Sequence, residues 1–149
     1  MSSLAELEEQ IVSAVKALVD DGLLTEQFLE LVRLQDSSEP TFLSELAGIF
    51  FSTAEEKLRE MNRMLADEAV GGATDYPELD NIAHKLKGSS ASFGARVVAE
   101  ECGALREACE SRQREACRGV VARQAAALEA LKGRLQEVME LDARRRALV

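Results

Sequence analysis

Apolar residues recur every three or four positions along most of the chain, which is the spacing of one face of an α-helix. Turn-forming residues interrupt this pattern and divide the chain into about six helical segments. No stretch alternates apolar and polar residues over the length of a strand. The sequence therefore predicts an all-α fold, with segments at roughly residues 3–20, 25–34, 40–67, 74–94, 95–110 and 112–143.

The last four segments are long and are joined by short breaks, as in an antiparallel four-helix bundle. We expect the two N-terminal segments to pack on one end or side of this bundle. Gly22 suits a left-handed position after the first segment, Thr25 is a candidate N-cap for the second, and Pro40 fits the first turn of the third. A chain of this length is expected to form one domain, residues 1–149.

Composition narrows the class of protein further. With 46% hydrophobic and 30% charged residues, the chain is expected to fold as a soluble globular domain. It has no apolar run of the ~20 residues that a membrane span needs, and its acidic N-terminus does not resemble a secretory signal. The net charge of -9 disfavours binding to nucleic acid or anionic membranes. Residues 1–75 carry a net charge of -11 and residues 76–149 carry +2, so the two halves present different electrostatic fields.

The three cysteines, Cys102, Cys109 and Cys117, raise the question of a metal or redox site. Their spacings of seven and eight differ from the pairs two to four residues apart that are typical of zinc sites, and the chain has a single histidine. Cys102 and Cys109 share the apolar stripe of the fifth segment, which favours packing as small hydrophobes. We therefore expect no metal site and reduced, buried thiols in an intracellular protein, with a metal or redox role as the alternative.

The fourth segment contains the most informative run of residues. It begins with Thr74 or Asp75 as N-cap and ends near Gly94. At about 100° per residue, one side of this helix is expected to face the core. That side is made of Leu79, Ile82, Ala83, Leu86, Ser90 and Phe93.

The single histidine, His84, points away from this core side, as do Gly88 and Ala91. A glycine in a helix interior costs ~1 kcal/mol relative to alanine, so Gly88 suggests that clearance beside His84 is needed. The alternative for Gly88 is close contact with another helix. For Gly48 and Gly103, which have no comparable neighbours, close packing is the expectation.

An exposed imidazole can act as a nucleophile because its neutral form carries a nitrogen lone pair. Hydrolytic catalysis would need a serine, cysteine or carboxylate partner, and the sequence has no Walker-type phosphate loop. Accepting a phosphoryl group on nitrogen needs only the imidazole and a nearby cation. Lys87, three residues after His84, can lie alongside the ring and offset the phosphoryl charge. The alternative is a surface histidine without a chemical role.

The run His84-Lys85-Leu86-Lys87-Gly88 resembles the His-x-x-Lys/Arg-Gly motif of histidine-containing phosphotransfer (HPt) domains. Its extension, Ser89-Ser90-x-Ser92-x-Gly94-Ala95, looks like that of the plant members that serve cytokinin two-component signalling. The resemblance extends over nearly the whole chain, including the Leu34-Gln35-Asp36 break and the cysteine spacing. Plant members typically have Gln directly after the histidine, whereas this chain has Lys85, as some bacterial relatives do.

The resemblance implies an HPt-like fold and a phosphorelay carrier. His84 would accept a phosphoryl group from an aspartate in the receiver domain of a hybrid sensor kinase and pass it to a response-regulator receiver. Lys87 would be its electrostatic neighbour, and Gly88 would provide clearance for the partner. No ATP-dependent kinase activity and no cofactor are expected, since Mg²⁺ would belong to the receiver.

The resemblance also implies a docking face. We expect it to join the fourth segment to exposed parts of the second and third, with Lys85, Gly88, Ala91 and Arg96 among its residues. The basic residues in this set suit the acidic pocket of a receiver. A monomer in the cytoplasm and nucleus is the expected state of the protein.

Two alternatives come from other classes of protein. One is a non-catalytic helical adaptor in which His84 is incidental. For a carrier and for an adaptor alike, the run Arg144-Arg145-Arg146 is expected to be a solvated helix end, with docking or localisation as its alternative role. An esterase or a metalloenzyme is disfavoured because the chain lacks the residues that such sites require.

Overall fold

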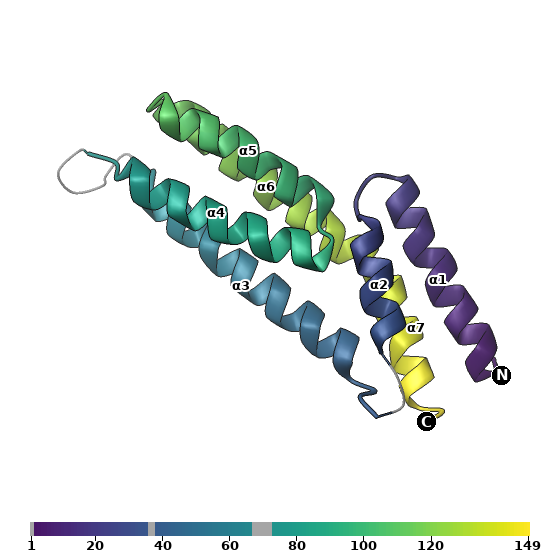
Figure 1. The fold of residues 1–149 in the computed structure, drawn as a ribbon. Helices are drawn as coiled ribbons and strands as arrows, with labels where there is room; N and C mark the ends of the chain where they lie inside the picture. The colour runs from purple at the N-terminus through teal and green to yellow at the C-terminus, as the bar shows by residue number, and fades with distance from the viewer. Residues whose placement is uncertain (1, 36–37, 67–72) are drawn as a thin grey trace.

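A computed structural model describes residues 2–35, 38–66 and 73–149. These residues form helices and no strand, apart from a single antiparallel bridge between Leu24 and Ala95. The predicted all-α class is confirmed. The helices, shown in Figure 1, are α1 (Leu4–Asp20), α2 (Glu26–Leu34), α3 (Phe42–Met64), α4 (Tyr76–Phe93), α5 (Arg96–Glu110), α6 (Arg114–Arg134) and α7 (Gln136–Arg146).

The helices α3 to α6 form the predicted antiparallel four-helix bundle. In it α4 packs against α3 and α5, and α6 packs against α5 and α3. The prediction left the position of the first two helices open. Figure 1 shows α1, α2 and α7 together at one end of the bundle, where α1 packs on α7 and α2 packs on α1 and α4.

The polar residues predicted to cap helices do so. The Thr25 hydroxyl accepts a hydrogen bond from the backbone N–H two residues on, and the Asp75 carboxylate accepts one from the N–H of Glu78. Gly22 and Gly94 follow α1 and α4 with φ angles of 81° and 94°, in the left-handed region that favours glycine.

Two predictions about helix limits differ from the structure, and the predicted end of the third segment, residue 67, lies outside the described residues. Pro40 was expected in the first turn of α3, but the helix begins at Phe42 with Thr41 as its N-cap, so Pro40 lies before it. The segment predicted at 112–143 is interrupted at Leu135, which ends α6 and precedes α7. Leu135 keeps a φ of -77° and a ψ of -10°, close to helical values, and α7 after it packs against α1.

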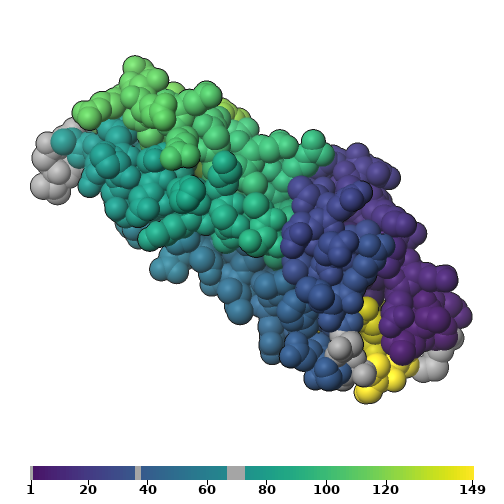
Figure 2. All heavy atoms as spheres, in the orientation of Figure 1, coloured from purple at the N-terminus to yellow at the C-terminus, as the bar shows by residue number. Residues whose placement is uncertain are grey.

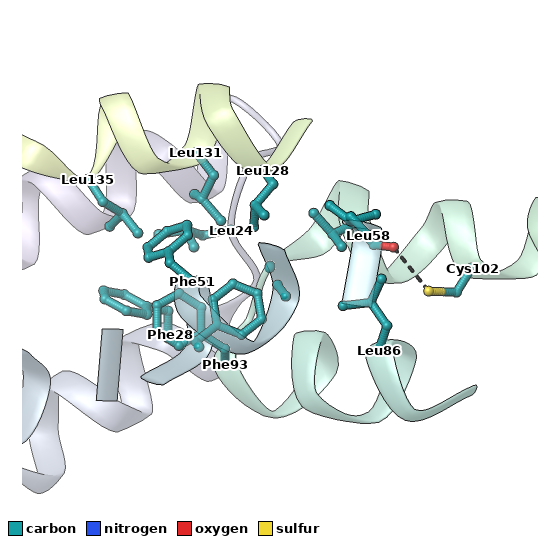
Figure 3. Close-up of a cluster of buried hydrophobic side chains, with 14 of the residues drawn as sticks. Leu24, Phe28, Phe51, Leu58, Leu86, Phe93, Cys102, Leu128, Leu131 and Leu135 are labelled. Carbon is teal, nitrogen blue, oxygen red and sulfur yellow. Dashed lines mark hydrogen bonds between the residues drawn. The ribbon is translucent and has the colours of Figure 1, made fainter. Parts of the chain in front are cut away.

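Aromatic side chains join three helices near the end of the bundle. The Phe93 ring of α4 stacks on Phe50 of α3, with centroids 4.2 Å apart, and meets Phe28 of α2 edge-on at 5.1 Å. Figure 3 shows Phe28, Phe51 and Phe93 together, with Leu58 and Leu86 farther along the bundle. Every residue expected on the core side of the fourth segment is buried, which confirms that prediction.

The predicted burial of the cysteines is also confirmed, since Cys102, Cys109 and Cys117 are all buried and free. Burial raises the pKa of each thiol, and for Cys109 it does so, together with the neighbouring Cys117, to about 12. The Gln124 amide donates to the Cys102 sulfur (3.2 Å) and to the carbonyl of Val98 (3.1 Å), and so ties α6 to α5. Among the described residues, no three His, Cys, Asp or Glu side chains gather in a way that could hold a metal ion.

The basic run at the end of α7 is only partly solvated, contrary to the expectation. Arg144 is exposed, but Arg145 is buried and donates to the fully buried carboxylate of Asp142 at 2.6 Å. Arg146 donates to the same carboxylate at 2.7 Å. The sequence prediction missed this because the position of Leu4, Glu8 and Pro40 beside Arg145 and Arg146 depends on tertiary packing.

Within the described ranges, no helix combines the length and the apolar character needed to cross a lipid bilayer.

Candidate functional site

The helix α4 holds His84 at the surface of the bundle. Its core residues are buried against α3 and α5, so the opposite side of the helix faces solvent. His84, Gly88 and Ala91 lie on that opposite side and are exposed, as predicted. In Figure 2, α4 (teal) forms the visible surface between α3 and α5, with α2 (blue) beyond its C-terminal end.

The two lysines of the motif flank His84 on different sides of α4. Lys87 lies on the side of α4 that faces α5. From there its positive charge acts on the Cys102 thiol of α5 and opposes the rise in pKa that burial causes. Lys85 projects about 160° away from Lys87 around the helix, towards α3. Both lysines are exposed. A phosphoryl group on His84 would therefore have a cation on each side.

Gly88 leaves open space one turn after His84. A Cβ atom at this position would meet nothing within 4 Å, so Gly88 does not serve close helix packing. Gly48 and Gly103 were expected to pack closely, and that prediction is wrong, because both are exposed with equally open surroundings. They lie on helix faces turned away from the core. What distinguishes Gly88 is its place beside the histidine.

The remaining predicted docking residue, Arg96, belongs to α5 rather than α4. It is exposed at the start of that helix, where its backbone N–H donates to the carbonyl of Leu23. Its guanidinium also pairs with Glu100 at 2.9 Å. The positive charge of Arg96 is therefore partly offset by Glu100. Its backbone lies next to the connection between α1 and α2.

An acidic residue also lies near His84. Asp80, one turn before the histidine, faces α5, where its carboxylate pairs with Arg106 at 3.5 Å. The positive charge of Arg106 therefore offsets the negative charge of Asp80, the acidic residue of α4 closest in sequence to His84. The two lysines, which are both exposed, are the charged residues of α4 closest in sequence to His84.

A groove of about 410 Å³ opens beside α4, on the side towards which Lys85 projects. The stacked rings of Phe50 and Phe93 form part of its lining, and Ile49, 66% exposed, stands at its edge. The other lining residues come from three helices: Gln27 and Leu31 of α2, Leu46 and Thr53 of α3, and Ser89 and Ser92 of α4.

The sequence prediction named the second and third segments for docking but none of these residues. Ile49 offered a signal, because it lies about 140° around α3 from the centre of the buried stripe. An isoleucine so far from the stripe is expected to be exposed. The groove around Ile49 is completed by residues of α2 and α4. Their position depends on tertiary packing, which the pattern of a single helix does not predict.

Comparison with known proteins agrees with this arrangement. The sequence pattern of the Hpt domain matches residues 45–140. The chain belongs to the Hpt domain family. Histidine-containing phosphotransfer protein 2 of Arabidopsis thaliana is 33% identical over 139 residues, which are 93% of this chain and 87% of that protein. The structure of a histidine-containing phosphotransfer protein from Medicago truncatula matches this Hpt chain with a TM-score of 0.81 and 32% identity, covering 95% and 93% of the two chains.

The family also contains relatives with a different name. A pseudo histidine-containing phosphotransfer protein of rice, Oryza sativa subsp. japonica, is 32% identical over 137 residues, covering 92% of this chain and 88% of that protein. This chain has a histidine, His84, exposed on the open face of α4.

Proposed function

We propose that this chain is a phosphorelay carrier that takes a phosphoryl group on His84 from one receiver-domain aspartate and gives it to another. The observation that carries the proposal is the exposed imidazole of His84 on the open face of α4, flanked by Lys85 and Lys87 with clear space at Gly88. Membership of the Hpt domain family supports it. The donor would be the receiver of a hybrid sensor kinase and the acceptor the receiver of a response regulator.

The chemistry needs little from the carrier itself. A nitrogen lone pair of His84 attacks phosphorus, and the aspartate carboxylate of the donor leaves with the electron pair of the broken P–O bond. In the second transfer an acceptor carboxylate attacks phosphorus, and the electron pair of the P–N bond returns to the imidazole. Catalysis in such transfers is mostly positioning and charge stabilisation, and Lys87 supplies a positive charge beside the group in transit.

The face around His84 has the properties of a docking site for a receiver domain. The groove beside α4 offers apolar contact through Ile49, Leu46 and Leu31, and it is continuous with the helix face that bears the imidazole. The lysines of α4 complement the acidic pocket in which a receiver holds its aspartate. We therefore place the receiver over α4, with its edge in the groove.

Several finer properties belong to the same proposal. The chain would act as one domain over residues 1–149, as a monomer, without ATP-dependent kinase activity of its own. The plant relatives support a role in cytokinin signalling. The cytoplasm and the nucleus are the proposed locations. Imaging of a fluorescent fusion tests the location, and sedimentation tests the oligomeric state.

The central experiment is transfer from a labelled receiver. The purified chain is incubated with a receiver domain carrying a radioactive aspartyl phosphate, and the label is followed on gels before and after acid treatment, since phosphohistidine is acid-labile. We expect acid-labile label on the wild type and none on His84→Gln. Equal labelling of both would exclude His84 as the acceptor. Binding of the receiver without any transfer would favour the adaptor alternative.

A further inference from the structure

Gln35 connects the end of α2 to the start of α3 through its side chain. It is the C-cap residue of α2, and its side-chain oxygen accepts a hydrogen bond from the backbone N–H of Leu43 at 2.8 Å. The first N–H groups of a helix have no partner within the helix, and Thr41, the N-cap of α3, makes no capping bond with its own side chain. Gln35 therefore caps α3 from a neighbouring helix.

The same amide is anchored on its other side. Its nitrogen donates to the Asp142 carboxylate at 2.8 Å, and that carboxylate is fully buried in α7. Arg145 and Arg146 hold Asp142 through bonds of 2.6 and 2.7 Å. Hydrogen bonds to a buried charged group are among the strong ones. Both the oxygen and the nitrogen of the Gln35 amide are therefore held by hydrogen bonds. This holds the end of α2 at a set distance from the start of α3.

This connection lies next to the proposed docking groove. Leu31, which lines the groove from α2, is one turn before Gln35, and Leu46, which lines it from α3, is one turn after Leu43. Direct packing between α2 and α3 is slight. Their spacing depends on Phe93, which lies between Phe28 and Phe50, and on the Gln35 amide, which lies outside the groove, one turn beyond Leu31.

We propose that Gln35 is a positioning residue for receiver docking: by joining Leu43 of α3 to Asp142 of α7, it sets the width of the groove between α2 and α3. The inference rests on the proposed function, since the groove must receive a receiver domain. Gln35 does not touch His84 or the phosphoryl group. Its loss should weaken docking while leaving the chemistry at the imidazole unchanged.

The test is Gln35→Met, which keeps the length of the side chain and removes both hydrogen bonds. We expect the KM for a phosphorylated receiver to rise about fivefold or more, because docking must then order the α2–α3 connection that these hydrogen bonds hold in the free chain, with kcat unchanged. Phosphoramidate, a small donor whose P–N bond breaks as ammonia leaves, needs no groove. The rate at which it phosphorylates His84 should stay within about twofold of the wild type. Loss of the amide protection of Leu43 in hydrogen exchange provides a direct readout of the missing cap.

Gln124→Met is the matched control. Gln124 is also a glutamine that bridges two helices, but it joins α6 to α5 and does not line the groove. We expect it to lose stability without a change in KM. The inference is overturned if the two variants raise KM equally, or if Gln35→Met leaves KM unchanged while the wild type transfers. If the wild type accepts no label from the receiver, the proposed function and the inference fall together.

Discussion

The backbone of Gly94 lies so close to Phe28 that a Cβ atom at position 94 would stand 2.8 Å from the Phe28 nitrogen. Beside this contact, the Gly94 carbonyl accepts a hydrogen bond from the N–H of Thr25 at 2.9 Å. The turn after α4 is thus joined to the first turn of α2. This contact places α2 at the end of the helix that carries His84.

Gly94→Ala should therefore destabilise the fold by about 2 kcal/mol or more, because it combines a left-handed φ with a steric overlap against backbone. Chemical denaturation measures the loss. Gly22→Ala is the control, since Gly22 has a similar φ of 81° but open space around its Cβ position. It should cost about 1 kcal/mol. Equal losses in the two variants would mean that the contact with Phe28 contributes nothing.

Gly88→Leu should block phosphoryl transfer without loss of stability. The new side chain meets no atom of this chain but would occupy the space one turn after His84. Because leucine favours a helix over glycine by up to about 0.8 kcal/mol, the melting temperature should rise slightly. Gly103→Leu, at an equally open position on α5, should gain the same stability and transfer normally. Normal transfer by Gly88→Leu would show that the clearance is not used.

Lys87→Ala should slow transfer from a receiver by about tenfold, since it removes a cation beside the phosphoryl group. Stability should change by no more than about 0.5 kcal/mol because the side chain is exposed. Single-turnover transfer measured by rapid quench gives the rate. Lys85→Ala, on the opposite flank of His84, should have a smaller effect on the rate. A larger effect of Lys85→Ala would reverse the roles assigned to the two lysines.

Ile49→Asp should raise the KM for a receiver by about tenfold, because it places a charge in the apolar part of the groove. The fold should tolerate the change, since Ile49 is 66% exposed. Val97→Asp, on an exposed apolar position of α5 outside the groove, provides the control. Equal KM values for the two variants would place docking elsewhere.

The buried thiols should make the fold sensitive to alkaline pH. Burial raises the pKa of Cys109 to about 12, whereas an unfolded cysteine has a pKa of about 8.5. The unfolded chain thus releases the proton first, and the free energy of unfolding should fall by about 1.4 kcal/mol per pH unit for each such thiol above pH ~8.5. Urea titrations under reducing conditions at several pH values measure this slope. Cys109→Ala should show a smaller slope than the wild type, and identical slopes would contradict the effect of burial.

Properties that belong to one helix could be predicted from the sequence. The caps at Thr25 and Asp75, the left-handed Gly94 and the outward direction of His84 follow from local hydrogen bonding and from a rotation of about 100° per residue. The periodicity gave no signal for the break at Leu135, because that residue is itself buried and continues the apolar spacing across it.

Properties that need two or more helices could not be predicted in the same way. The groove takes Leu31, Ile49 and Ser92 from three different helices, and its existence depends on how α2 lies against α4. The burial of Arg145 depends in the same way on Asp142 and its neighbours. A run of arginines in sequence carries no information about which of them will be covered.

The packing of α1 against α7 has a consequence for how the chain folds as it is made. Ser2 and Arg144, 142 residues apart, are joined by a hydrogen bond, and the apolar side of α1 is covered largely by α7. A ribosome releases the N-terminal helix first. The apolar side of α1, which includes Leu7 and Ile11, stays partly uncovered until α7 has emerged. Contacts of such long sequence separation slow folding, so α1 is open to chaperones and to aggregation until α7 packs on it.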